Sequence, residues 1–143
     1  MADMIPHAFF RSLMEKEQDL NATDVIKVGL VDNTATPTVD LDKWTDYSGD
    51  ELAASGGYTT GGDTVTGAVT DSDANDNCKF DISDPTWTAS GGTLGGVAAR
   101  YAVVYNSTTG DVIYVIDLGA DQTITDGQQF TIQIDADGLF TVA

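Results

Sequence analysis

Hydrophobic residues near the start of the chain recur at the spacing of an amphipathic helix. Between residues 6 and 20, Phe9, Leu13 and Leu20 lie on one stripe of a helical wheel, and further apolar side chains flank that stripe. The pattern predicts one helix over residues 6–20, and it is the only helix that the chain is expected to form. We expect its apolar stripe to pack against a sheet or a neighbouring subunit.

From residue 25 onward the pattern changes to short apolar runs separated by turn residues. The run at 25–31 is rich in β-branched residues and lies between aspartates, and similar runs recur after residue 63 at the spacing of an all-β sandwich or barrel. The later strands are expected at 64–69, 78–82, 86–88, 97–105, 111–118, 130–135 and 139–142. The predicted fold is mainly β: an antiparallel β-sandwich or barrel with one short N-terminal α-helix.

Two β-hairpins are expected among these strands. One joins 99–105 to 112–118 through a turn at 106–110, and the other joins 131–134 to 139–142 through an Asp/Gly-containing turn. The strands of the first hairpin contain apolar residues on both faces, which is typical of strands covered on both sides.

The chain length of 143 residues fits one domain. Residues 1–24 are expected to form a helix and turn of the same domain as the β-rich part, 25–143. A long segment at 32–63 has no clear strand pattern, and a segment of this length is usually functional or packed by its own aromatic residues. We expect Trp44 and Tyr47 to anchor it to the domain.

The charge balance narrows the classes of partner. Six basic residues face 23 acidic ones, giving a formal net charge of −17. Binding to nucleic acid or to an anionic membrane is disfavoured, because both would repel such a chain. The N-terminal sequence carries an acid where a signal peptide has a basic region, and no long apolar run follows it, so synthesis in the cytoplasm is expected.

Candidate catalytic and metal-binding residues are few. The chain has one histidine, His7, and one cysteine, Cys78, and neither lies in a recognisable nucleophile motif, so neither enzymatic activity nor a cofactor is expected. Asp71, Asp73 and Asn75 match the first positions of a calcium loop, but an aspartate replaces its glycine and an isoleucine its bidentate glutamate. A solvated acidic turn is therefore favoured over a calcium site.

Four large aromatic residues allow two interpretations. They could line a platform for stacking sugars, as in adhesion or carbohydrate-binding modules, or they could anchor the core and the long loop. Anchoring is favoured because large aromatic side chains dominate burial energetics. The residues are Trp44, Tyr47, Tyr58 and Trp87.

Several segments together resemble a group of small structural proteins of tailed bacteriophages. The likeness runs from about residue 6 to the C-terminus, and it is carried by the segments DVIKVGLVD (24–32), GGYTTGG (56–62), DPTWT (84–88), ARYAVVY (99–105) and IDLG (116–119). The resemblance implies a virion protein that decorates or cements the outside of the capsid. A collar, neck or tail component is the alternative, and no set of functional residues comes with the likeness.

The resemblance also implies partners. They are the major capsid protein and further copies of the chain, with a homotrimer expected first because icosahedral shells offer threefold and quasi-threefold sites. An outer head location suits a chain that packaged DNA would repel. The candidate subunit or capsid contacts are Phe9, Arg11, Leu13, Lys16, Leu20, Lys43, Trp44, Tyr47 and Tyr58.

Overall fold

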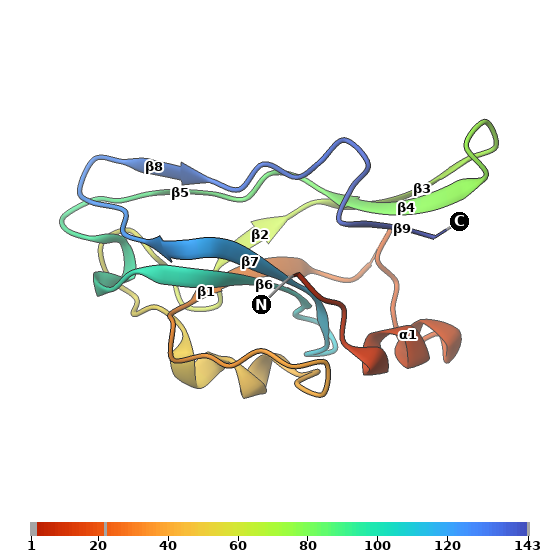
Figure 1. The fold of residues 1–143 in the computed structure, drawn as a ribbon, viewed down its shortest axis with the longest axis horizontal. Helices are drawn as coiled ribbons and strands as arrows, with labels where there is room; N and C mark the ends of the chain where they lie inside the picture. Colours follow the sequence, from red (N-terminus) through yellow and green to blue (C-terminus); the bar gives the residue numbers. More distant parts are fainter. Residues whose placement is uncertain (1–2, 22, 143) are drawn as a thin grey trace.

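A four-stranded antiparallel sheet forms the middle layer of the protein, as seen in a computed structural model that describes residues 3–21 and 23–142 (Figure 1). The strand order is β2-β1-β6-β7. The bounds are β1 Ile26–Val31, β2 Asp63–Val65, β6 Ala99–Asn106 and β7 Val112–Gln122. The hairpin predicted around residues 106–110 is confirmed as the β6–β7 pair.

A second layer of two small antiparallel sheets covers one face of the middle sheet (Figure 1). One sheet has the order β3-β4-β9, and the other pairs β5 with β8. Their strands are β3 Gly67–Ser72, β4 Asn77–Ile82, β9 Phe140–Val142, β5 Thr86–Thr88 and β8 Gln129–Thr131. The predicted fold class, an antiparallel β-sandwich with one helix near the N-terminus, is confirmed.

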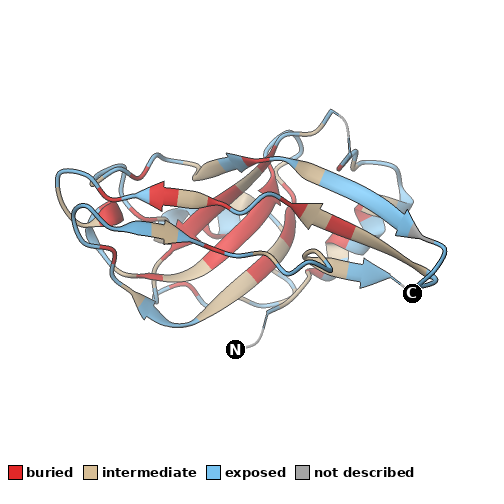
Figure 2. Cartoon of the chain, turned by 90° about the horizontal axis from the view of Figure 1, so that it is seen from above, coloured by how far each residue is buried: buried red, intermediate tan, exposed pale blue. Residues whose placement is uncertain are grey.

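Residues 33–50 of the long segment form a third layer on the other face of the middle sheet, whereas Leu52 and Tyr58 from its later part join the core under the second layer. The third layer contains two short 3₁₀ helices, η1 Trp44–Asp46 and η2 Ser48–Asp50, and a third, η3 Leu94–Gly96, precedes β6. Because side chains alternate along a strand, β1 and β6 send Leu30 and Val104 into the core under the second layer and Val103 into the core under the segment. Figure 2 shows these buried strands in red.

Aromatic side chains hold this segment on the sheet, as the sequence predicted. The Trp44 indole stacks on the Tyr105 ring with 4.3 Å between centroids and 4° between planes. Gly29 makes the close approach possible, because a Cβ atom there would lie 2.3 Å from Cη2 of Trp44. Tyr47 is 1% exposed in the same core.

The helix is shorter than predicted. Helix α1 spans His7–Met14 and not residues 6–20. It ends because Lys16 adopts a left-handed conformation with φ 61°, while the Glu17 N–H donates to the Ser12 carbonyl and the Lys16 N–H to the Leu13 carbonyl. These two bonds form a Schellman motif, which satisfies the last helical carbonyls. Leu20 is still buried, but the turn after the helix carries it.

The strand predicted at 64–69 is two strands in different sheets. At Thr66 the chain leaves the β1–β2 pair and enters the β3–β4 pair, and Thr66 and Ser83 exchange two hydrogen bonds at this crossing. A continuous run of strand-forming residues does not reveal such a crossing, because both halves have the same local pattern.

The second predicted hairpin, 131–134 with 139–142, is wrong. Its two flanks pair with different strands: β8 with β5, and β9 with β4. The Asp135–Gly138 turn forms, with the Gly138 N–H donating to the Asp135 carbonyl at 2.8 Å, but Leu139 then donates to Phe80 and not to the preceding flank. A turn motif fixes the local bend, whereas the partner of each strand depends on the sheets nearby.

Buried tyrosines make the fold sensitive to alkali. Burial raises the pKa of Tyr47 and of Tyr105 to about 12, and it also raises the pKa of Tyr58. Unfolded tyrosine ionises near pH 10, so the unfolded chain gains charge while the folded rings stay neutral. We expect the free energy of unfolding to be maintained below pH 10 and to fall between about pH 10 and 12, as measured by urea unfolding. Tyrosinate absorbance that titrates fully near pH 10 with the fold intact would contradict this.

Candidate interaction surface

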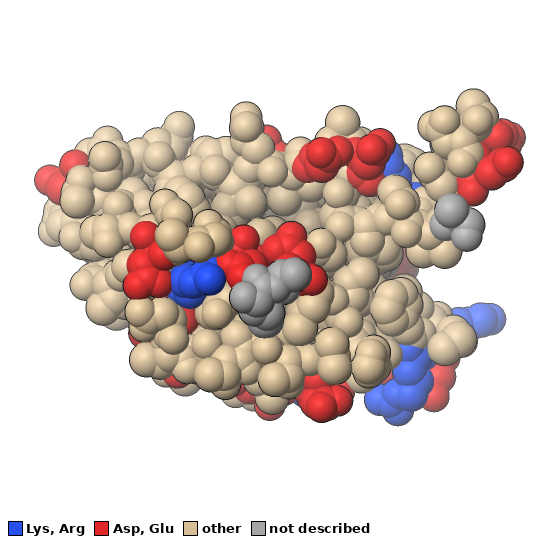
Figure 3. Space-filling model, in the orientation of Figure 1, with Lys and Arg blue, Asp and Glu red and all other residues tan. Residues whose placement is uncertain are grey.

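Helix α1 and the β3-β4-β9 sheet diverge at one end of the molecule and leave an open apolar cleft of about 180 Å³ between them. Figure 3 shows this hollow at the right, between the helix below and the β3–β4 hairpin above. Leu13 and Leu20 line the helical side. The sheet side is lined by Val69, Cys78, Lys79, Phe80, Phe140 and Val142.

The strand register explains why the cleft is apolar. Val69, Phe80 and Phe140 lie opposite one another on three adjacent strands, and Cys78 lies opposite Val142 one step further out. Residues directly opposite in a sheet share a face, so alternate positions build one apolar surface. Phe9 of α1 covers its inner half, with 5.9 Å between the Phe9 and Phe140 ring centroids.

The outer half of this surface is exposed to solvent. Val69 is 39% exposed and Val142 57% exposed, and on the neighbouring face of α1 Phe10 and Met14 are 41% and 80% exposed. They are four of the six large hydrophobic side chains that are exposed among the described residues. Such clustering, in contrast to single scattered residues, marks an interaction surface.

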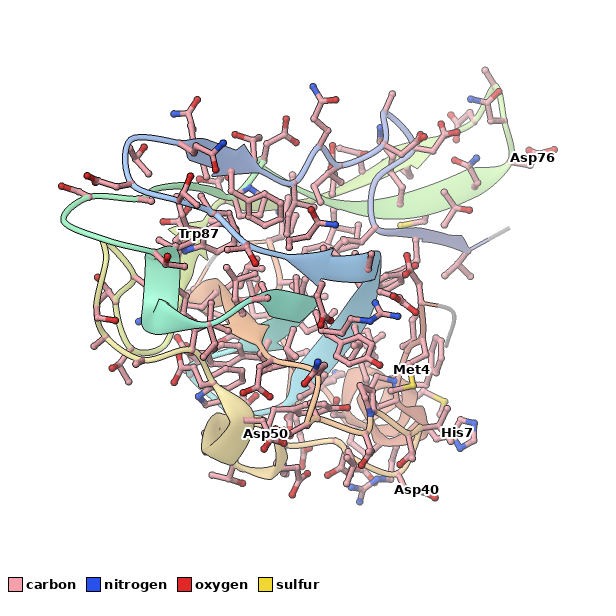
Figure 4. The ribbon with its side chains drawn as sticks, turned by 60° about the vertical axis from the view of Figure 1, so that its left-hand side comes forward. Met4, His7, Asp40, Asp50, Asp76 and Trp87 are labelled. Atoms are coloured by element: carbon pink, nitrogen blue, oxygen red, sulfur yellow. The ribbon has the colours of Figure 1, made fainter. Side chains whose placement is uncertain are left out.

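The exposed charges around the cleft are mixed on the helical side and acidic at the hairpin tip. Arg11 and Lys16 are exposed on the helical side together with the acids Glu15, Glu17 and Asp19, and Arg11 lies 3.9 Å from Glu15. The tip of the β3–β4 hairpin carries the exposed acids Asp71, Asp73 and Asp76. Figure 3 shows basic side chains in blue with acidic ones in red beside them at the lower right, and the acidic tip in red at the upper right. Figure 4 shows Asp76 projecting from the tip, away from the body.

Of the nine predicted contact residues, Leu13 and Leu20 line this cleft, and Arg11 and Lys16 are exposed on the helical side of it. Three others have side chains that are buried in the chain's own core: Phe9, Tyr47 and Tyr58. That they contact a subunit or the capsid stays a prediction.

The remaining two predicted contacts, Lys43 and Trp44, hold the long segment in place. Lys43 pairs with Asp111, and this hydrogen bond raises the pKa of the lysine. Trp44 is half-buried against Tyr105.

The predicted aromatic anchors are confirmed as packing residues. Tyr58 is 4% exposed, and its hydroxyl accepts from the Leu30 N–H at 3.0 Å and donates to Glu51 at 2.8 Å. Trp87 is 6% exposed and stacks on Phe130 with 6.0 Å between centroids. These rings therefore do not form an exposed platform for sugars.

The acidic turn around Asp73 is the tip of the β3–β4 hairpin. Among the described residues, no group of three or more His, Cys, Asp or Glu side chains is placed to hold a metal ion. That the segment folds without calcium stays a prediction. No helix in the described parts of the chain has the length and apolar character needed to cross a membrane.

Comparison of the chain with protein-family models, with curated proteins and with solved structures gives no match. The cleft must therefore be interpreted from its own geometry.

Leu13 tests how the cleft contributes to stability. Its side chain is half-buried at an open edge, so Leu13→Ala should lower the free energy of unfolding by only about 1–2 kcal/mol. Phe9→Ala, which empties the closed inner half, should cost about 3–5 kcal/mol. Urea unfolding of both variants measures the difference. Equal losses would place Leu13 in the core and not in an open cleft.

Proposed function

We propose that this chain is a non-enzymatic structural protein of a tailed-bacteriophage virion that decorates the outer surface of the head and stabilises it. The observation that carries the proposal is the open apolar cleft with the exposed side chains of Val69 and Val142, a surface suited to protein contact. The resemblance to small phage structural proteins supports placing that contact on a virion.

Charge supports an exterior position. Packaged DNA is a dense polyanion, and a chain of net charge −17 is repelled from it, whereas the outside of a shell tolerates this charge. The charge also keeps free subunits soluble before assembly. A protein that binds only the assembled shell stabilises the shell by its binding free energy, so no chemistry is required of it.

The test uses purified particles and shells that lack the chain. We expect the chain in stoichiometric amounts in the particles, and we expect added chain to bind empty shells and raise their resistance to heat and low salt. Particles without the chain, or shells equally resistant without it, would contradict the proposal. Labelling that places the chain at the collar, neck or tail would keep the virion role and reject head decoration.

A matched pair of variants connects the binding to the cleft. Val142→Asp adds one negative charge at the cleft, and Val97→Asp adds the same charge at another exposed valine. We expect Val142→Asp to weaken shell stabilisation about tenfold or more and Val97→Asp to leave it near the wild-type level. Equal effects of the two variants would show that shell stabilisation does not depend on the cleft.

A further inference from the structure

We propose that Asn106 is a positioning residue for the cleft: it fixes the turn that follows α1, and through this turn it sets where the helical side of the cleft lies. The inference rests on the proposed function, because it takes the cleft as the surface through which the chain acts. It concerns a buried side chain at the end of β6, which is not one of the residues that line the cleft.

Asn106 is one of only three non-aromatic polar side chains that are buried among the described residues, and it is 0% exposed. Its amide makes all four hydrogen bonds that an asparagine side chain can form. The oxygen accepts from the backbone N–H groups of Thr108 and Thr109, at 3.0 and 3.4 Å. The nitrogen donates to Oε1 of Gln18 at 2.7 Å and to Oδ2 of Asp24 at 2.6 Å. One end of the amide therefore holds the β6–β7 turn, and the other end holds the turn after α1.

The turn after α1 carries part of the helical side of the cleft. Asp24 closes this turn, because its carboxylate accepts from the Asp19 N–H at 2.6 Å and its own N–H donates to the Asp19 carbonyl at 3.2 Å. Leu20, which lines the cleft, lies within the closed turn. The hydrogen bond from Asn106 to Asp24 therefore fixes the segment that places Leu20.

Gln18 ties the same turn to a second buried residue. Its amide nitrogen donates to Oδ2 of Asp111 at 2.6 Å, while its amide oxygen accepts from Asn106. Asp111 is 8% exposed, and its other carboxylate oxygen pairs with Lys43 of the long segment. One polar network therefore joins the turn after α1, the β6–β7 hairpin and the long segment.

Such a network fixes position more strictly than apolar packing does. Apolar contact is non-directional, so the apolar side chains of α1 tolerate small shifts against the sheets. A shift of the turn would instead leave a buried N–H of Asn106 without an acceptor, which is strongly unfavourable. Helix α1 has only eight residues and is too short to be stable on its own. We therefore expect the helical side of the cleft to move when the Asn106 donor is removed.

The experiment removes this donor and then restores it. Asn106→Asp keeps an oxygen that accepts from the β6–β7 turn, but it replaces the donating nitrogen with a carboxylate oxygen that repels Asp24. Adding Asp24→Asn supplies a donor from the opposite side and returns the net charge to that of the wild type. Asn33→Asp is the matched control, since it adds the same charge at an exposed asparagine that donates to Asp121.

The measurement is the rate at which Cys78, on the sheet side of the cleft, reacts with a maleimide in the free chain. We expect Asn106→Asp to raise this rate about tenfold, and the added Asp24→Asn to return it to within about threefold of the wild type. Asn33→Asp should leave it unchanged. The raised rate should not depend on low concentrations of urea, because local opening exposes little surface whereas global unfolding exposes much.

A second variant covers the case in which Asn106→Asp does not fold. Gln18→Ala removes one partner of the Asn106 amide without adding charge, and it should raise the Cys78 rate about threefold. An unchanged rate in a folded variant at Asn106 or Gln18 would overturn the inference. An equal rise in Asn33→Asp, or a rise that Asp24→Asn does not reverse, would also overturn it.

Shell stabilisation by the same variants tests the proposed function separately. Asn106→Asp should weaken it, and the added Asp24→Asn should restore it. A variant with the raised Cys78 rate that stabilises shells as well as the wild type would support the positioning role of Asn106 and contradict a function through the cleft. A wild-type chain that binds no shells would reject the proposed function, while the Cys78 rates in the free chain would still decide the role of Asn106.

Discussion

Gly62→Ala should lower the free energy of unfolding by about 3–5 kcal/mol. Gly62 has φ +79°, and a Cβ atom there would lie 1.9 Å from the Val28 carbonyl oxygen. Val28 belongs to a central strand with a buried side chain, so the backbone cannot move aside without breaking the sheet. Urea unfolding followed by tryptophan fluorescence measures the loss.

Gly110→Ala is the matched control. Gly110 has nearly the same conformation, φ +82°, but nothing lies within 4 Å of the position of its Cβ atom. It should show only the cost of a left-handed alanine, about 1–2 kcal/mol. If the two variants lose equal stability, the segment before β2 does not approach β1 as closely as described.

Trp44→Ala should cost about 3–4 kcal/mol, because it removes the ring that joins the long segment to the middle sheet. A second substitution, at Gly29, tests the same contact. Gly29→Ala is expected to be destabilising in the wild type, since its new methyl group would overlap Trp44, and to be nearly neutral once Trp44 is alanine. Urea unfolding of the two single variants and the double variant gives the coupling energy.

The expected coupling between these two sites is about 1–3 kcal/mol. Alanine is the suitable substitution at Gly29, because it adds only the methyl group that would meet the Trp44 indole. A larger side chain such as phenylalanine would disturb the sheet itself. Additive losses would show that Trp44 does not lie over Gly29, and the third layer would then be attached in another way.

The sequence predicts those features of the fold that depend on local patterns. Alternation and β-branched runs locate most strands, and the turn at 106–110 identifies the β6–β7 hairpin. The interpretation of Trp44 and Tyr47 as anchors also succeeds, because large rings in a polar segment have few other ways to be buried.

Features that depend on long-range pairing are not visible in these patterns. The crossing between sheets at Thr66 and the separate partners of β8 and β9 are decided by strands far away in the sequence. The end of α1 depends on Lys16 in a left-handed conformation. Glycine is the usual residue at such a position, so the sequence pattern does not predict that the helix ends there.

The candidate site was predicted in part. The predicted stripe contains Leu13 and Leu20, which line the cleft, whereas Phe9 of the same stripe is buried in the core. The sheet side of the cleft was missed. The alternating apolar residues of β3, β4 and β9 can be recognised in the sequence. Only the packing of α1 shows that half of the apolar face of this sheet stays uncovered.

The sole cysteine of the chain provides a direct measurement of whether the cleft is a contact surface. Cys78 is half-buried on the sheet side of the cleft. Its rate of reaction with a maleimide can be compared between dilute chain and chain bound on particles, with Cys78→Ser/Val97→Cys as a control for a thiol outside the cleft. We predict that Cys78 reacts about tenfold or more slowly on the particle, while the control thiol is unchanged. Equal rates for Cys78 in the two states would contradict a function through this cleft.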